Sequence, residues 1–173
     1  VYAVLAEKKF FSTDELSNHY QNGSNLSGHI SHKNIPGVEI STGSLGHGLP
    51  ISVGMALARK KSNKKGKIYV LISDGECQEG TTWESLLIAS KHQLDNLVVI
   101  IDYNKLQALS KLKDALPLNS LSSKIKAFNC NCIEIKKGHS FSDLIQGFKK
   151  IKKLKVKGKI YVMISDGECQ EGT

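Results

Sequence analysis

The sequence predicts an α/β fold in which a doubly wound, mainly parallel sheet carries helices on both of its faces. Two observations predict this class. Residues 67–72 (KIYVLI) and 97–101 (LVVII) are dominated by Ile, Val and Leu, the composition of strands buried on both faces. Segments with helical spacing of apolar residues separate such runs, and strands that alternate with helices favour a parallel sheet.

Upstream of the first strand, the sequence predicts helix and a long loop. Residues 1–9 are typical of the end of a helix, and Ser12 or Thr13 is placed to cap a second helix. Residues 21–40 are polar and show no period, so we expect a loop, and loops of this length are often functional. Residues 49–61 carry Ala and Met at helical spacing and predict a helix.

Downstream of the first strand, the predicted elements alternate. We expect a helix over residues 81–93, with Leu86, Leu87 and Ala89 facing inward. Ligands of such sheets bind beyond the carboxyl ends of the strands, so we expect a site after the two strongest strands. The remaining predicted elements are a short helix over residues 121–128, a strand over 132–135, a helix over 141–150 and a strand over 159–164.

Composition excludes several classes of protein. The chain is 40% hydrophobic and 23% charged, which is typical of a globular domain. No apolar run approaches the roughly 18 residues that span a bilayer, and no secretory signal is recognisable, so we expect no membrane association and, by default, a cytoplasmic location. The four cysteines lack zinc-site spacing and are interpreted as reduced thiols.

The formal net charge of +8 makes nucleic-acid binding one interpretation. The lysines are scattered except between residues 149 and 159, where they crowd together without aromatic residues that could stack on bases. We therefore favour a solvated helix end and loop and expect no nucleic-acid partner, with a phosphate-binding tail as the alternative.

One segment occurs twice. Residues 65–81 and 157–173 are identical at all but one position, which indicates a recent duplication, a chimera, or an engineered or assembly artefact. We divide the chain into a domain over residues 1–156, incomplete at its start, and a repeat over residues 157–173 that supplies a strand and a tail. We expect the repeat to have no partner strand that carries an Asn, so its Asp166 is a poor candidate for a metal ligand.

The first copy carries the residues that point to chemistry. Mg²⁺ prefers a few protein oxygens together with phosphate and water. Asp74 offers a carboxylate after one strand, and Asn104 offers an amide oxygen after the next. Gly75 allows the backbone to approach a phosphate closely. An Asp-Gly pair is also an ordinary turn, so the surrounding residues decide between the two interpretations.

Those residues resemble the thiamine-diphosphate-binding domain of transketolases, in particular the amino-terminal subunit of split transketolases. The resemblance covers nearly all of residues 1–155, although Ser73 stands where the family usually has Gly. It rests on residues 73–84 (SDGECQEGTTWE), 94–97 (LDNL) and 102–107 (DYNKLQ), and on residues 28–29 (GH), 35–39 (IPGVE), 42–48 (TGSLGHG) and 138–141 (GHSF).

The resemblance implies roles for individual residues. Thiamine diphosphate and Mg²⁺ are the implied cofactors. His29 and Glu79 are the implied catalytic residues: His29 would contact the sugar substrate, and Glu79 would join a carboxylate network at a subunit interface. The implied Mg²⁺ ligands are the side chains of Asp74 and Asn104 and the carbonyl of Leu106. The implied cofactor-binding residues are Gly43, Leu45, Asp74, Gly75, Glu76 and Asn104.

Three of these residues have other interpretations from the sequence alone. Leu45 is also compatible with an ordinary core position, and His29 with a loop histidine bonded to backbone. Glu79 is also typical of a carboxylate at the start of a helix, where the helix dipole favours negative charge.

The implied reaction is the transfer of a two-carbon ketol unit between sugar phosphates, with chemistry that belongs to the cofactor. In the family, a Glu on a pyrimidine-binding domain across a dimer interface helps to remove a proton. We recognise no such domain, so we expect a homo- or hetero-oligomer that is inactive without a carboxy-terminal transketolase subunit. The alternatives are a non-catalytic binding module and a non-functional fragment or chimera. A dinucleotide-binding domain is disfavoured, since no G-x-G-x-x-G follows a strand.

Overall fold

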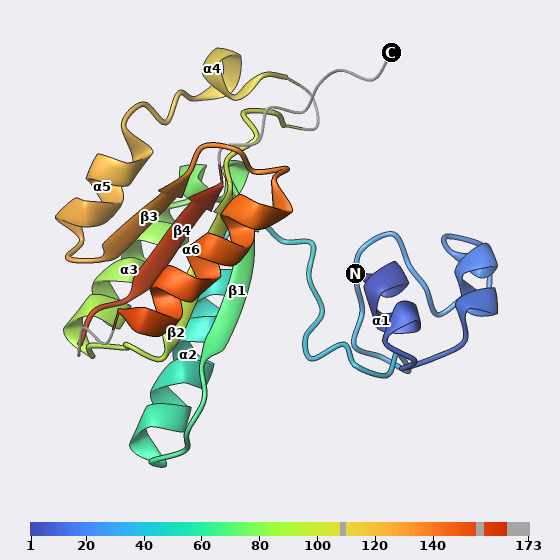
Figure 1. Cartoon of the computed structure of the whole chain (residues 1–173). Helices are drawn as coiled ribbons and strands as arrows, with labels where there is room; N and C mark the ends of the chain where they lie inside the picture. The colour runs from blue at the N-terminus through green and yellow to red at the C-terminus, as the bar shows by residue number, and fades with distance from the viewer. Residues whose placement is uncertain (108–109, 155–157, 166–173) are drawn as a thin grey trace. The chain divides into compact units, whose positions relative to one another are not determined.

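A computed structural model describes residues 1–107, 110–154 and 158–165. The chain forms two compact units, residues 1–44 and residues 45–173 (Figure 1), and each is described by itself. This boundary was not predicted from the sequence. No helix within the described residues is long and apolar enough to cross a membrane.

The first unit is mostly loop, as predicted. Its helix α1 (Tyr2–Glu7) is followed by a 3-10 helix, η1 (Thr13–Asn18). The hydroxyl of Ser12 accepts a hydrogen bond from the Asp14 backbone N–H at 3.2 Å, so the predicted cap is present although the helix is of the 3-10 type. A small core holds the unit together, formed by Tyr2, Leu26 and Ile35.

The second unit contains a four-stranded parallel sheet. Its strands are β1 (Ile68–Ser73), β2 (Leu97–Asp102), β3 (Asn131–Ile135) and β4 (Tyr161–Ser165). The spatial order is β1-β2-β4-β3, and all three pairings are parallel. All four predicted strands are confirmed.

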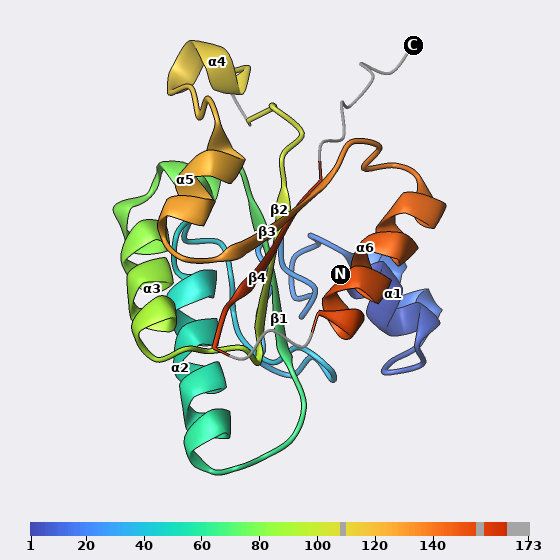
Figure 2. The same cartoon turned by 60° about the vertical axis from the view of Figure 1, so that its left-hand side comes forward.

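Helices cover both faces of this sheet (Figure 2), which confirms the predicted fold class. On one face lie α2 (Gly48–Lys61), α3 (Gly80–Lys91) and α5 (Leu121–Ala127), and on the other lies α6 (Phe141–Lys153). The sequence did not predict two short elements, the 3-10 helix η2 (Gly75–Gln78) and the helix α4 (Leu112–Ala115).

One predicted core residue of α3 is wrong. Leu86 and Ala89 are buried, at 2% and 0% exposure, whereas Leu87 is 57% exposed. Residues three apart share a face of a helix, and consecutive residues point in directions about 100° apart. Leu86 and Ala89 therefore define the buried face, and Leu87 lies outside it.

The repeated segment forms a central strand. β4 lies between β2 and β3, and the Tyr103 N–H, just after β2, donates to the Ser165 carbonyl at 2.9 Å. The expectation that the repeat has no partner strand carrying an Asn is therefore wrong, because Asn104 follows β2. The apolar residues of the repeat form the strand that joins β3 to β2, because β3 pairs with no other strand among the described residues. Asp166 lies outside the described residues.

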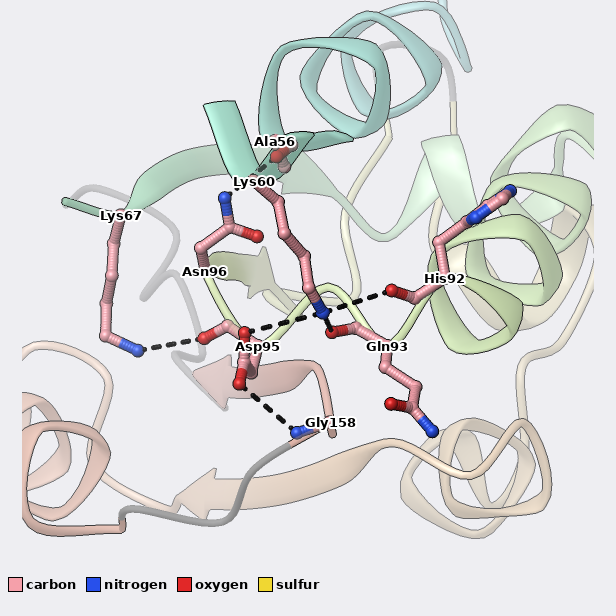
Figure 3. A network of polar contacts seen from close by, with 8 residues as sticks. All are labelled: Ala56, Lys60, Lys67, His92, Gln93, Asp95, Asn96 and Gly158. Atoms are coloured by element: carbon pink, nitrogen blue, oxygen red, sulfur yellow. Dashed lines mark hydrogen bonds and ion pairs between the residues drawn. The ribbon is translucent and has the colours of Figure 1, made fainter. Parts of the chain in front are cut away.

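The turn before β2 holds the amino ends of both copies (Figure 3). The Asp95 carbonyl accepts a hydrogen bond from Lys67 Nζ at 3.1 Å, and the Asp95 carboxylate accepts one from the Gly158 N–H at 3.2 Å. Lys67 Nζ also lies 4.5 Å from the centre of the Tyr161 ring. The Asn96 carbonyl accepts from the Ile68 N–H at 2.8 Å, so this turn aligns β1 and β4 on either side of β2.

Candidate functional site

The candidate site lies where β1 and β2 end. Asp74 directly follows β1, and Asn104 lies two residues after β2. The strands are in register to their last residues, since Ser73 pairs with Asp102. The Asp74 N–H donates to the Asp102 carbonyl at 3.1 Å, which extends the ladder by one bond and holds the two turns together.

Asp74 is a buried carboxylate with one unsatisfied oxygen. Its exposure is 1%. Oδ2 accepts a hydrogen bond from the Lys105 N–H at 2.8 Å, whereas Oδ1 is buried and has no hydrogen-bond partner among the described residues. Burial raises the pKa of Asp74, and the backbone N–H groups of Lys105 and Gly75 oppose this shift. Since an unpaired buried oxygen is costly, the carboxylate fits a bound cation.

Asn104 and Leu106 place two further oxygens on the neighbouring turn. Asn104 Oδ1 accepts a hydrogen bond from the Leu106 N–H at 2.8 Å, and its Nδ2 donates to Asp102 Oδ2 at 3.3 Å. An amide oxygen has two lone pairs, so one remains for a cation. The Leu106 carbonyl accepts none of the hydrogen bonds that join the described residues. This set of oxygens is the kind that Mg²⁺ binds.

The turn after β1 is held by a reciprocal pair of hydrogen bonds. The Ser73 N–H donates to Glu76 Oε2 at 2.9 Å, and the Glu76 N–H donates to Ser73 Oγ at 3.4 Å. This is the S-x-x-E capping-box arrangement, and its signal was present in the sequence. Ser73, which departs from the family's usual Gly, therefore stabilises the turn, and the Glu76 carboxylate is engaged in holding it.

Sequence reasoning missed two glutamines beside this turn. Gln107 Nε2 donates to Gln78 Oε1 at 2.9 Å, and Gln78 Nε2 donates to the Leu116 carbonyl at 2.8 Å. The Gln107 amide nitrogen lies 3.4 Å from the position that a Cβ on Gly75 would take. Gly75 does not have a left-handed φ. A glycine suits this position because the side chain of Gln107 approaches its backbone closely.

A cavity of about 640 Å³ adjoins the site. It shares Asn104 and Leu106 with the candidate metal ligands, and Pro117 and Leu118 line it as well. A cavity of this size can take a small organic molecule. The candidate cation position thus borders a space that apolar residues line together with the basic residues Lys105, Lys111 and Lys113.

Glu79 and Leu45 lie near the start of α3. Glu79 is the exposed residue that precedes the helix, and its side chain makes no capping hydrogen bond. Gly46 has a left-handed φ of +74°, and a Cβ there would lie 2.7 Å from the Cβ of Glu79. Thr81 Oγ1 donates to the Gly46 carbonyl at 2.8 Å, so this loop is tied to the helix. Leu45 is 52% exposed, which excludes the core interpretation.

His29 and Gly43 belong to the first unit and lie together within it. Gly43 has a φ of +124°, and a Cβ there would lie 2.9 Å from Cγ of the His29 ring. The His29 carbonyl accepts a hydrogen bond from Ser27 Oγ at 2.5 Å, and its side chain is exposed. The structure thus gathers two of the predicted residues in one unit and the oxygen ligands in the other.

Comparison with known proteins decides the family. Residues 2–159 match the thiamine diphosphate binding domain of transketolase. The chain belongs to the transketolase family. A transketolase from Campylobacter jejuni has a similar structure, with a TM-score of 0.81 and 30% identity over 90% of this chain and 25% of that chain.

Related sequences include single subunits of split transketolases. The chain is 42% identical to one subunit of the apulose-4-phosphate transketolase of Actinobacillus succinogenes, over 95% of its own length and 58% of the relative's length. It is 37% identical to human transketolase over 86% of its length and 24% of the relative's length. The chain thus spans about half the length of the split-transketolase relatives that it matches.

Proposed function

We propose that the chain is the cofactor-binding component of a transketolase-like enzyme, which transfers a two-carbon ketol unit between sugar phosphates with thiamine diphosphate and Mg²⁺. The observation that carries the proposal is Asp74 Oδ1, which is buried at the ends of two parallel strands and has no hydrogen-bond partner in the part of the chain that the structure describes. The family match over residues 2–159 supports the choice of cofactor.

In this proposal, Asp74 Oδ1, the Asn104 side-chain oxygen and the Leu106 carbonyl would hold Mg²⁺ beside the diphosphate. Gly75 lets the backbone meet the diphosphate, and Glu76 supports that approach by holding the turn. When bound, thiamine diphosphate would supply the chemistry of the ketol transfer. The protein residues bind and orient it.

The remaining predicted residues keep their proposed roles. Gly43 and Leu45 contact the rings of the cofactor, His29 contacts the sugar substrate, and Glu79 joins a carboxylate network between subunits. The exposure of His29, Leu45 and Glu79 supports roles that involve a ligand or another chain.

We also propose that catalysis requires a separate carboxy-terminal subunit with a pyrimidine-binding domain, in an oligomer with at least two subunits. Two of the relatives are named as individual subunits of an apulose-4-phosphate transketolase, which supports a division of the enzyme between chains. Within the described part of the chain, Cys77, Cys130 and Cys132 are free thiols. A cytoplasmic location stays part of the proposal.

A calorimetric titration of thiamine diphosphate tests the binding site. We expect binding by the purified chain with Mg²⁺ and its loss when EDTA removes the metal. Asn104→Leu keeps the size of the side chain but removes its oxygen, so we expect an affinity at least about tenfold lower, since a lost ligand to a charged group costs about 1.5–3 kcal/mol. Equal affinity with Mg²⁺ and with EDTA would reject the metal site.

A further inference from the structure

We propose that Gln107 is an additional diphosphate-contacting residue and that Gln78 is the positioning residue that aims it. This inference rests on the proposed function, because it assumes that the diphosphate binds at Gly75. It adds a side-chain donor to a site so far built from Mg²⁺ ligands and backbone.

The position of the Gln107 amide supports this contact. Its Nε2 lies 3.4 Å and its Cδ 3.8 Å from where a Cβ on Gly75 would be. The amide therefore occupies the space directly beside the glycine that we expect to meet the diphosphate. An amide nitrogen carries two N–H donors. One of them donates to Gln78 Oε1 at 2.9 Å, which leaves the second for an anionic oxygen.

The contacts of Gln78 fix which way the Gln107 amide is turned. Gln78 belongs to η2, the 3-10 helix that begins at Gly75. Its Nε2 donates to the Leu116 carbonyl at 2.8 Å, so its oxygen is the atom directed at Gln107. Because this oxygen is an acceptor, the amide nitrogen of Gln107 faces it. The Gln107 amide therefore presents an N–H, and not its oxygen, to the turn at Gly75.

The same two bonds join three separate segments of the chain. Gln78 follows β1, Gln107 follows β2 and ends the segment with Asn104 and Leu106, and Leu116 follows α4. Both side chains are only half-buried, so their removal should affect overall stability little. Their effect should instead appear in binding of a diphosphate.

The test measures binding of two ligands, thiamine diphosphate and inorganic diphosphate, each with saturating Mg²⁺. We expect Gln107→Met to weaken both by about tenfold, the scale of a hydrogen bond to a charged group. Gln107→Glu should weaken both further, because it keeps the shape but places a carboxylate beside the diphosphate. Gln78→Met should give a smaller loss. Gln146→Met, an exposed residue of α6, is the matched control and should change nothing.

The Mg²⁺ concentration at half-saturation distinguishes two explanations. Gln107 either contacts the diphosphate directly or acts indirectly by supporting the Mg²⁺ ligands. We expect it to stay the same in Gln107→Met and Gln78→Met, since the metal ligands are intact. Three outcomes would overturn the inference while the proposed function stands. They are wild-type affinity in Gln107→Met, a Gln107→Glu variant that binds as well as Gln107→Met, and a raised Mg²⁺ requirement in either methionine variant. Absence of binding by the unsubstituted chain would overturn both.

Discussion

Asp74 is the residue whose surroundings say most about function. Asp74 is 1% exposed, and one of its oxygens lacks a hydrogen-bond partner among the residues that the structure describes. Such a carboxylate reduces the stability of a protein that binds no ligand there. Residues with that cost are common at binding sites. Part of this was predictable, because Asp74 and Asn104 follow strands in the sequence. The Gln78–Gln107 pair was not, since two surface glutamines 29 positions apart carry no periodic signal.

Asp74→Asn should therefore stabilise the metal-free protein. We expect its free energy of unfolding at neutral pH to exceed that of the unsubstituted chain by about 1 kcal/mol, since a buried charge is removed. Burial raises the pKa of folded Asp74 above the ordinary 3.8, so folding favours its protonated form. The difference should therefore shrink as the pH falls through the folded pKa toward 3.8.

Urea denaturation over a range of pH measures this effect. Glu84→Gln, which removes a carboxylate from α3 at a position away from the site, is the control and should show no such dependence. A metal-free Asp74→Asn protein that is less stable than the unsubstituted chain at neutral pH would contradict the description of Asp74 as an unsatisfied charge.

At the scale of elements, β1 and β4 show what a local sequence determines. Their residues are nearly identical, and both form strands. Yet β1 lies at an edge of the sheet and β4 lies in the middle, where α6 also covers it. Strand formation was therefore predictable from composition. The order of the strands was not, because it depends on which neighbours each copy meets. The short elements η2 and α4 were missed because they span only 4 residues each.

The two copies provide their own matched control for packing. Met163 is 1% exposed, and its counterpart Leu71 is 69% exposed. We expect Met163→Ala to lower the free energy of unfolding by about 2–5 kcal/mol, the usual cost of truncating a buried side chain. Leu71→Ala should change it by less than about 0.5 kcal/mol. Chemical denaturation of both variants measures the difference, and equal losses would show that β4 is not the central strand.

At the scale of the whole molecule, the repeat contributes to the fold. Its strand completes the sheet, and the Asp95 turn holds Gly158 of the repeat as well as Lys67 of the first copy. The repeat is thus part of the sheet and not an appendage to it. The sequence predicted a strand here but not its central place.

The proposed division of the enzyme between chains predicts a clear activity pattern. The purified chain should give no ketol transfer between sugar phosphates when thiamine diphosphate and Mg²⁺ are saturating. Addition of a carboxy-terminal subunit with a pyrimidine-binding domain should restore turnover, because in the proposal that subunit would supply the Glu that assists proton removal. A coupled assay of two-carbon transfer measures this. Turnover by the chain alone would reject the need for a partner.

The central claim is that the first copy, and not the repeat, carries the cofactor site. The most direct measurement is a calorimetric titration of thiamine diphosphate with Mg²⁺ into Asp74→Ala and Asp166→Ala, two substitutions at equivalent positions of the two copies. We predict that Asp74→Ala abolishes binding and that Asp166→Ala binds like the unsubstituted chain. Binding that survives Asp74→Ala, or that is lost in Asp166→Ala, would contradict the claim.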